Sequence, residues 1–185
     1  MEDGRRRGAV GRFFSWLPGN RTTGQRERVT IMMQRTLVLL KPDCFQRRMI
    51  GRITARFEDR GLNLLAMKLM RATPELARRH YAEHLEKEWY PELERFLTSG
   101  PLVAMVLEGP DVIRVVRTMI GMRSGLESAP GTIRGDLSAS GHKNLVHASD
   151  SPGSADREIS IFFREDEIFP EYSHLEIWLR DDDER

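Results

Sequence analysis

The chain is poor in the features that mark several common classes of protein. It has one cysteine among 185 residues, Cys44, so it forms no intramolecular disulfide and supplies no cysteine-based zinc site by itself. Its longest apolar runs, such as residues 37–40 and 102–107, are far shorter than the ~20 residues of a transmembrane helix. It also lacks both common glycine-rich phosphate motifs, G-x-x-x-x-G-K-[ST] and G-x-G-x-x-G. Any phosphate site must therefore be built from side chains.

Lysine is absent from the first 33 residues, and this segment differs in charge from the rest of the chain. It contains seven Arg and three acidic residues, a net charge of 7 − 3 = +4, whereas the remaining Lys and Arg against Asp and Glu give 22 − 25 = −3. A protein that binds nucleic acid carries a basic surface on its folded part. The acidic balance after residue 33 predicts that nucleic acid is not a specific partner.

Residues 1–33 form an Arg-rich extension outside the predicted core. Their composition fits a mitochondrial transit segment, although Glu2 and Asp3 depart from the acidic-poor pattern of such segments, and a disordered arm is the alternative. The length of the chain suits one domain with an extension. We expect that domain over residues 34–164, followed by a C-terminal tail with an acidic end over residues 165–185.

Hydrophobic periodicity divides the core into short strands and amphipathic helices. Residues 121–143 show no periodicity, so we expect a long functional loop there. The order of elements favours an α+β fold, a ferredoxin-like βαββαβ sandwich with helices packed on an antiparallel sheet. Strands are predicted at residues 36–40, 62–70, 102–107 and 144–147, and helices at 46–60, 74–81, 91–97, 112–120 and 152–163.

Three of the five histidines are candidates for chemistry. His80 and His84 lie four residues apart on a predicted helix and could share a face as metal ligands, but Tyr81 follows His80, so the zinc motif H-E-x-x-H is not met. His147 ends a predicted strand and precedes the small and helix-capping residues 148–152, at a strand-to-helix junction where reactive groups are often displayed. By itself this position leaves both a structural and a reactive role open.

Three motifs carry a resemblance to a known family. They are K-P-D at residues 41–43, P-G-T-I-R-G-D at 130–136 and N-L-V-H-A-S-D-S at 144–151. Together they resemble the nucleoside diphosphate kinase family, over residues 34–163. The resemblance implies a ferredoxin-like fold. It also implies an enzyme that transfers the γ-phosphoryl group of a nucleoside triphosphate such as ATP to a nucleoside diphosphate, by a ping-pong mechanism through a phosphohistidine.

The resemblance also implies roles for individual residues. His147 matches the nucleophile and Glu158 the carboxylate that orients it. Without a glycine-rich loop the phosphates need cationic side chains, and Mg²⁺ is expected to be held chiefly by the phosphates themselves. The matching positions are Lys41, Arg117 and Arg134 for phosphate, Asn144 for the sugar, Trp89 for the base, and Tyr81, Leu93 and Ser149 as supporting residues.

The base-binding position differs from the family, which has Phe where this chain has Trp89. An indole ring also offers a face on which a base stacks. We therefore expect base binding to be retained with an altered preference among bases. The alternative is that Trp89 packs in a small satellite core with Tyr90 and Leu93.

Three further positions depart from the family pattern. Cys44 replaces the Gly of K-P-D-G, where its side chain could disturb Lys41 and offers a thiol to oxidation. Arg123 replaces a Thr that contacts phosphate, and its cation either takes over that contact or points to solvent. Gly125 replaces a Pro, which predicts a more mobile loop. These departures keep a second hypothesis open, a weakly active or inactive relative that serves as a binding or membrane-contact module.

Assembly and location follow from the resemblance and from the extension. Family members are hexamers or tetramers, which implies a homo-oligomer here, with a hexamer favoured. The Arg-rich extension resembles those of mitochondrial members, which predicts a mitochondrial location, with the cytoplasm as the alternative. Its arginines also suggest contact with anionic lipid.

Overall fold

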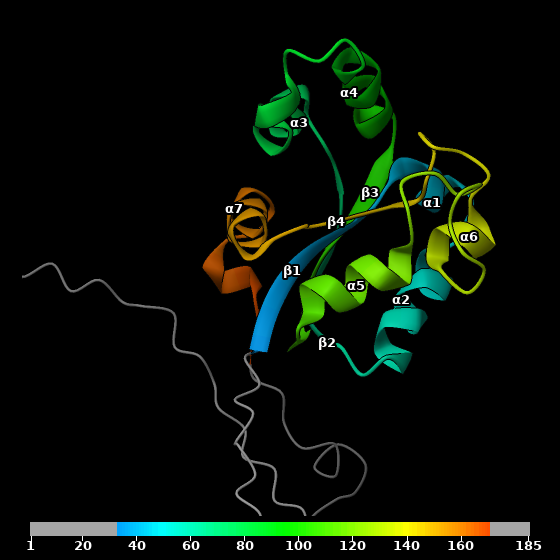
Figure 1. The fold of residues 1–185 in the computed structure, drawn as a ribbon. Coiled ribbons are helices and arrows are strands. Elements are labelled where there is room, and N and C mark those ends of the chain that lie inside the picture. Colours follow the sequence, from blue (N-terminus) through cyan, green and yellow to red (C-terminus); the bar gives the residue numbers. More distant parts are fainter. Residues whose placement is uncertain (1–32, 171–185) are drawn as a thin grey trace, which may run out of the picture.

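The computed structural model describes residues 33–170. The predicted extension, apart from Met33, and the acidic end of the tail lie outside these residues. Figure 1 shows the described part as one sheet with helices on both of its faces. Within residues 33–170 no helix is both long and apolar enough to span a membrane.

The four strands of the described residues form one antiparallel sheet in the order β2-β3-β1-β4. β1 lies between β3 and β4, in a register that sets Leu39 opposite Ala104 on one side and His147 on the other. This strand order and the helices on the sheet confirm the predicted ferredoxin-like α+β fold. The strands are β1 Met33–Leu40, β2 Asn63–Arg71, β3 Pro101–Pro110 and β4 Val146–Ala148.

The helices follow the predicted order, with two differences described below. Prolines begin several of them, because the fixed φ of proline suits the first helical turn. The helices are α1 Pro42–Gln46, α2 Ile50–Asp59, α3 Pro74–His80, α4 Tyr90–Thr98, α5 Val112–Ile120, α6 Ile133–Leu137 and α7 Pro152–Phe162, with 3-10 turns η1 Ala82–His84 and η2 Glu165–Glu167.

The prediction of one continuous helix over residues 46–60 is wrong. The chain forms two helices there, α1 and α2, and α1 already begins at Pro42. Arg48 between them has a φ of 57°, a left-handed conformation that a continuous right-handed helix does not contain. The apolar spacing of Ile50, Ile53 and Phe57 therefore belongs to α2 alone. Helix α1 follows directly after β1, and Lys41 is the one residue between them.

The expectation that residues 121–143 contain no regular structure also needs correction, because helix α6 lies within them. The Thr132 hydroxyl caps this helix by accepting a hydrogen bond from the backbone N–H of Gly135 at 3.0 Å. Five residues are too few to show a helical repeat of apolar positions, so periodicity cannot find such a helix. The threonine cap was the available signal.

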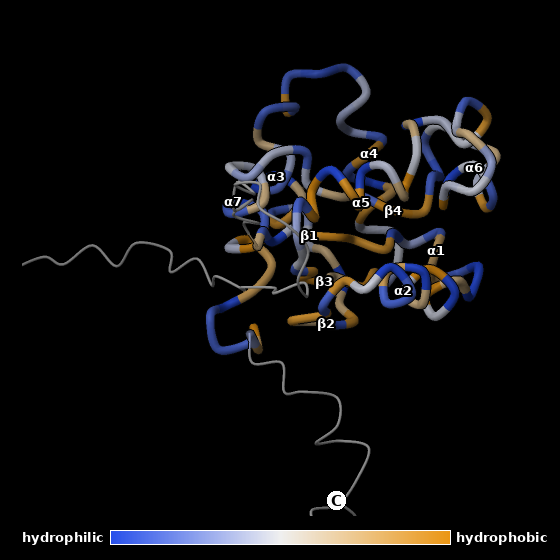
Figure 2. The backbone as a smooth tube through the Cα atoms, turned by 60° about the horizontal axis from the view of Figure 1, so that its bottom comes forward, coloured by the Kyte–Doolittle hydropathy of each residue, from blue (hydrophilic) through white to orange (hydrophobic). Residues whose placement is uncertain are grey.

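Both faces of the sheet are buried, by alternating side chains of β1 and β3. Val38 and Leu40 belong to the core beneath α2 and α5. Leu37 and Leu39 belong to the core beneath α3, α4 and α7. Figure 2 shows the strands largely in orange, the colour of apolar residues. A sheet covered on both faces explains why its central strands read as continuous apolar runs.

Residues 165–170 continue past α7 and pack on β2. Lys68 of β2 donates hydrogen bonds to the carboxylate of Glu167 at 2.9 and 3.0 Å, and the backbone N–H of Phe169 donates to the carbonyl of Leu65 at 2.9 Å. The first part of the predicted tail thus lies at the outer strand of the sheet, away from the residues that line the site.

Candidate active site

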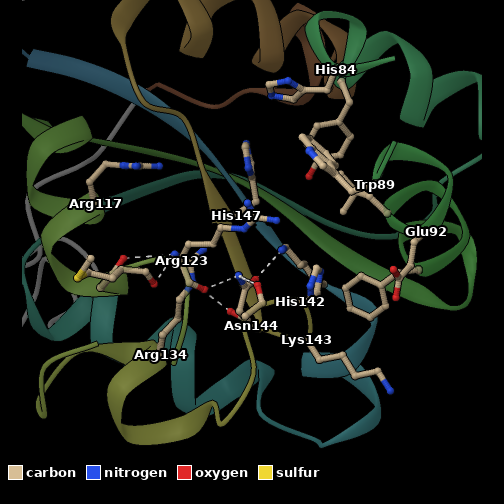
Figure 3. Close-up of a pocket in the computed structure, with 17 residues that line it drawn as sticks. His84, Trp89, Glu92, Arg117, Arg123, Arg134, His142, Lys143, Asn144 and His147 are labelled. Atoms are coloured by element: carbon tan, nitrogen blue, oxygen red, sulfur yellow. Dashed lines mark hydrogen bonds between the residues drawn. The ribbon is translucent and has the colours of Figure 1, made fainter. Parts of the chain in front are cut away.

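A cavity of about 460 Å³ gathers most of the predicted site residues. Its walls come from the connection between α3 and α4, the C-terminal end of α5 and the chain that leads into β4. Figure 3 shows Arg117 on one side of His147, with His84 and Trp89 on the other. The predicted residues that line the cavity are Lys41, Tyr81, Trp89, Leu93, Arg117, Arg123, Arg134, Asn144 and His147.

His147 lies in the middle of β4, one residue earlier than the predicted strand-to-helix junction. Its position in the sheet is fixed by pairing with Leu39. Three residues after the strand, the Ser151 hydroxyl caps α7 by accepting a hydrogen bond from the backbone N–H of Ser154 at 3.2 Å. The short connection brings α7 back against β4, so that a residue two turns along α7 faces the histidine.

That residue is Glu158, which holds the His147 ring from the side away from the cavity and is itself held by Ser149. The Nε2 atom of His147 lies 3.2 and 3.1 Å from the two carboxylate oxygens of Glu158. The Ser149 hydroxyl donates to Glu158 Oε2 at 2.7 Å and accepts from the backbone N–H of Leu37 at 3.2 Å. Nε2 therefore carries the ring proton toward Glu158, and Nδ1 keeps a free lone pair.

Glu158 is ionised in this environment although it is almost fully buried. Burial opposes its ionisation, but hydrogen bonds from His147 and Ser149 and the nearby histidine charges outweigh burial and lower the pKa of Glu158. The carboxylate is thus present at neutral pH. It fixes the tautomer of His147 and balances positive charge that develops on the imidazole.

Lys41 and Asn144 meet at the floor of the cavity, although they lie more than one hundred residues apart in the sequence. Lys41 Nζ donates to Asn144 Oδ1 at 2.6 Å. The Asn144 amide donates in turn to the carbonyls of Arg123 and Gly141 at 2.7 and 3.0 Å. Burial, reinforced by the charge of Arg134, lowers the pKa of Lys41 to about 8. Lys41 is therefore a cation that loses its charge just above neutral pH.

Arg134 is a buried arginine whose guanidinium holds the surrounding backbone. It donates to the carbonyls of Asn144 and Val146 at 3.2 and 2.6 Å, and to those of Gly121 and Met122 at 3.2 and 3.0 Å. A guanidinium has five N–H groups, so these four bonds leave one for another partner. Burial and then the Arg117 charge lower the pKa of Arg134 to about 10, so the group stays charged at neutral pH.

Arg117, Arg123 and Trp89 form the exposed part of the cavity. Arg117 on α5 makes one long hydrogen bond, from Nη1 to the carbonyl of Ala148 at 3.5 Å. The Arg123 guanidinium lies 5.7 Å from the centre of the Trp89 ring, a cation–π distance. Trp89 is 36% exposed and lines the cavity, while Tyr90 is buried and donates to Glu94 at 2.7 Å. The satellite core with Tyr90 therefore does not describe Trp89.

Comparison with known proteins agrees with this site. A sequence profile of the family described as nucleoside diphosphate kinase matches residues 34–168. The chain is also 60% identical over 153 residues to the nucleoside diphosphate kinase of Rhodopirellula baltica, an alignment that covers 82% of this chain and all of that relative. The chain belongs to the nucleoside diphosphate kinase family. It is therefore an enzyme of nucleotide phosphoryl transfer, and the hypothesis of an inactive binding module is not favoured.

Other members of the nucleoside diphosphate kinase family support the assignment. The enzyme of Natronomonas pharaonis is 53% identical over 148 residues, which cover 79% of this chain and 96% of that relative. The structure of a halophilic nucleoside diphosphate kinase from Halobacterium salinarum in complex with CDP has a TM-score of 0.75 and 43% identity, and the match covers 80% of this chain and 99% of that one. The orthorhombic form of the Aquifex aeolicus enzyme has a TM-score of 0.72 and 42% identity, over 74% and 99%.

Two positions that depart from the nucleoside diphosphate kinase pattern, Cys44 and Gly125, are both buried and closely packed in this fold. Cys44 is fully buried in α1, and burial, reinforced by Asp43, raises the pKa of its thiol to about 12. A buried, protonated thiol is a poor target for oxidation, so the structure argues against the oxidation-sensitive role considered above. Gly125 is also buried, and a Cβ added there would lie 2.0 Å from the carbonyl oxygen of Ser138. The close approach of two chain segments therefore requires glycine at this position.

Sequence reasoning missed several residues that line the site of this nucleoside diphosphate kinase. His142 and Lys143 precede Asn144 and line the cavity although both are exposed. Glu92 and Phe96 enter from α4, and their spacing of four residues on a predicted helix was the available signal. His80, which the sequence suggested only as a metal ligand together with His84, does not line this cavity. It is the most buried of the histidines with described positions, and its ring lies 4.7 Å from that of His147.

Proposed function

We propose that this enzyme transfers the γ-phosphoryl group of ATP or another nucleoside triphosphate to a nucleoside diphosphate through phosphorylation of His147 on Nδ1. The observation that carries the proposal is the pairing of His147 Nε2 with the Glu158 carboxylate at 3.1 Å. This pairing leaves the nucleophilic lone pair on the other ring nitrogen, in a cavity lined by Lys41, Arg117 and Arg123.

The first half-reaction forms a phosphorus–nitrogen bond and breaks a phosphorus–oxygen bond. The Nδ1 lone pair attacks the γ-phosphorus, and the bridging oxygen leaves with its electron pair on the nucleoside diphosphate. The imidazole gains positive charge as the bond forms, and the Glu158 carboxylate stabilises that charge through Nε2–H. An incoming nucleoside diphosphate then attacks the same phosphorus and restores neutral His147. One pocket serves donor and acceptor in turn, which gives ping-pong kinetics.

The cationic side chains stabilise the negative charge on the transferred phosphoryl group. Arg117 and Arg123 are exposed, make few bonds within the described chain, and are free to contact phosphate oxygens. Lys41 approaches from the floor of the cavity. Arg134 contributes its charge and one remaining N–H while it fixes the backbone around it. Phosphoryl transfer depends mainly on such positioning and electrostatic stabilisation.

The base stacks on Trp89 at the exposed rim. Because every base offers a π-face, stacking supports binding of several nucleobases. Asn144 is committed to Lys41 and to two backbone carbonyls, so its contact with the sugar would use the remaining lone pair of Oδ1. This arrangement supports broad use of nucleoside diphosphates.

Members of the family use a divalent cation, and we propose Mg²⁺ bound to the nucleotide phosphates as part of the substrate. Mg²⁺ prefers oxygen ligands, chiefly carboxylates and phosphates. Glu92 is the one carboxylate that lines the cavity within residues 33–170, against five cationic side chains. These residues do not form a Mg²⁺ site of their own, so the ion enters and leaves with the nucleotide.

We also propose a homo-oligomer, with a hexamer favoured, a mitochondrial location and contact of the Arg-rich segment with anionic lipid. The first rests on the family and the other two on the seven arginines of residues 1–33. Sedimentation of the full chain measures its assembly, and binding to vesicles with and without anionic lipid tests the contact. The N-terminus of the mature protein in cells tests the location: an intact Met1 in the cytosol contradicts it.

Mass spectrometry tests the mechanism directly. Purified enzyme is mixed briefly with ATP and Mg²⁺ and then with GDP, beside a His147→Ala control. We expect a mass gain of one phosphate that GDP removes and that the control lacks. A correctly folded wild-type enzyme that gains no phosphate would contradict the proposal.

A further inference from the structure

His80 has no role in the mechanism above, yet it lies directly behind the reactive histidine. Its side chain is fully buried, and neither ring nitrogen has a hydrogen-bond partner within residues 33–170. Burial, followed by the nearby charge of His147, lowers the pKa of His80 to about 3. A buried polar group without a partner is rare in folded proteins and indicates an unfilled interaction.

The unpartnered ring faces the two groups that hold the catalytic site. His80 Nδ1 lies 3.8 Å from Glu158 Oε1, and His147 Nε2 lies 3.1 Å from Glu158 Oε2. One ligand atom from each of the three side chains lies within 4.8 Å of the others. The two imidazole rings are nearly perpendicular, with an angle of 86° between their planes.

These distances match the spacing of ligands around a small transition-metal ion. At metal–ligand distances near 2.1 Å, tetrahedral ligand atoms are separated by about 3.4 Å. Measured from one oxygen, Glu158 Oε1, the His147 Nε2 atom lies 3.2 Å away and the His80 Nδ1 atom 3.8 Å away, on either side of that value. Two neutral imidazoles and a carboxylate are also a ligand set that zinc and related ions accept.

We propose that His80, His147 and Glu158 form an inhibitory site for a transition-metal ion such as Zn²⁺. A cavity of about 90 Å³, lined by these three residues and by Asp150 and Ser154 among others, adjoins the site and leaves room for the ion and a water ligand. The site is distinct from Mg²⁺ on the nucleotide because its ligands are two nitrogens and one carboxylate.

Inhibition follows from the tautomers of imidazole and rests on the proposed function. Without metal, the proton of His147 is on Nε2 and the lone pair of Nδ1 is available to attack phosphorus. A metal ion on Nε2 displaces that proton, and the neutral ring carries it on Nδ1 instead. Nδ1 then has no lone pair, so His147 is not phosphorylated. No net proton is released, because the proton moves from one ring nitrogen to the other.

The surrounding charges limit the affinity of the site and its range of ions. Arg157 Nη2 lies 4.0 Å from Glu158 Oε1 and opposes any cation there. Mg²⁺ requires near-octahedral oxygen ligands and dehydrates reluctantly, so two imidazole nitrogens in a small cavity exclude it. Zn²⁺ and Co²⁺ accept tetrahedral nitrogen and oxygen ligands. We therefore expect inhibition by Zn²⁺ and Co²⁺ at concentrations where added Mg²⁺ has no such effect.

The binding test uses the full chain without nucleotide. Co²⁺ absorption and Zn²⁺ calorimetry are measured for wild type, His80→Gln and His84→Gln. His84 is a matched control, because it lies four residues further along and also lines the smaller cavity, but it does not belong to the three-residue cluster. We expect one tetrahedral ion in wild type and His84→Gln, and at least tenfold weaker binding at that site in His80→Gln. Equal binding by wild type and His80→Gln would overturn the proposal.

A second measurement needs no substitution and remains decisive if His80→Gln does not fold. Nitrogen NMR of the wild-type histidine rings reports which nitrogen of His147 carries the proton. Addition of Zn²⁺ should move that proton from Nε2 to Nδ1, and an unchanged Nδ1 signal at saturating Zn²⁺ would also overturn the proposal. Because both tests omit nucleotide, their failure is distinguishable from failure of the phosphohistidine mechanism, which is measured in the absence of zinc.

Discussion

The two walls of the nucleotide cavity are built in different ways. On one wall, Arg134, Asn144 and Lys41 are buried and joined by hydrogen bonds to each other and to backbone carbonyls. On the other wall, Trp89 and the Arg123 side chain that reaches it are exposed and meet only through a ring contact. The first wall is preorganised by bonds within the protein, whereas the second is adaptable.

This difference suits the two ends of a nucleotide. The phosphates are common to every substrate, and transition-state charge is best stabilised by groups that do not have to reorganise. The bases vary, and a stacking surface tolerates that variation. We call the wall of Arg134, Asn144 and Lys41 the bonded wall and the wall of Trp89 and the Arg123 side chain the adaptable wall. Substitutions in the bonded wall should reduce stability and activity strongly, and substitutions in the adaptable wall only weakly.

The largest effect is expected for Arg134→Met, which breaks the bonded wall at its centre. Four backbone carbonyls lose their donor, so the free energy of unfolding should fall by about 3 kcal/mol. Turnover should fall by at least ~100-fold, the scale for loss of a preorganised charged donor. Denaturant unfolding and steady-state kinetics measure both. Arg114→Met on the exposed side of α5 is the matched control. Equal losses of stability and turnover in the two variants would contradict a special role of Arg134 in a preorganised wall.

A strong pH dependence is expected from Lys41, because its pKa of about 8 lies within the working range. Above pH 8 the free enzyme loses this charge, so kcat/KM should fall about tenfold per pH unit. In Lys41→Arg this fall of kcat/KM above pH 8 should disappear, since arginine remains charged across the whole pH range measured. If kcat/KM of Lys41→Arg still fell above pH 8, the ionisation responsible would belong to another group.

Lys41 also predicts how stability depends on pH. The pKa of this lysine is about 8 when folded and near 10.5 in its ordinary state. Between these values the unfolded chain binds more protons than the folded one, so the contribution of Lys41 to stability rises with pH across that window. Below pH 8 both states are charged and the contribution is constant. Chemical unfolding of wild type and Lys41→Met at pH 7.5 and 10 isolates this contribution, because other titrating groups such as Cys44 are common to both chains. Between the two pH values, wild type should gain stability relative to the variant.

A smaller effect is expected in the loop beside the bonded wall, which supplies the Arg123 carbonyl to Asn144 and packs closely against Ser138. Gly125→Ala places a Cβ 2.0 Å from the carbonyl oxygen of Ser138, so the segment must shift, and overpacking of this kind costs about 1–3 kcal/mol. Gly51→Ala in α2 is the control, because no atom lies within 4 Å of its added Cβ and alanine favours a helix. Thermal unfolding should separate the two variants in opposite directions. A stabilised Gly125→Ala would show that this wall is looser than its contacts indicate.

The smallest effect is expected on the adaptable wall. Trp89→Phe keeps a stacking face and should change KM for any one nucleotide by less than about threefold, whereas Trp89→Ala should raise KM by about tenfold. Kinetics with ADP, GDP and CDP as acceptors also report base preference. A large, base-specific loss in Trp89→Phe would mean that this wall reads the base rather than tolerating it.

Much of the fold was predictable because its signals are local. Apolar runs marked the strands, and Thr73 and Ser151 marked helix starts at which the structure shows capping hydrogen bonds. The break at Arg48 and the five-residue helix α6 were not predictable from periodicity, since one depends on a single φ angle and the other is too short to repeat.

The site was predictable to a different degree. The resemblance to the family implied that His147, Lys41, Arg117 and Asn144 share one site, and the structure places them in one cavity. They gave no indication that Arg134 binds four backbone carbonyls, because those partners are main-chain atoms with no sequence signature. The position of His80 against Glu158 was equally hidden.

The amino-acid sequence alone identifies the family, the reactive residue types and the apolar pattern that covers both faces of the sheet. Each of these depends on residue identity and on neighbours along the chain. The folded structure is needed to know which nitrogen of His147 faces the cavity, how far the pKa of Lys41 falls and which further histidine approaches Glu158. These properties depend on distances and burial among segments far apart in sequence, and folding alone brings those segments together.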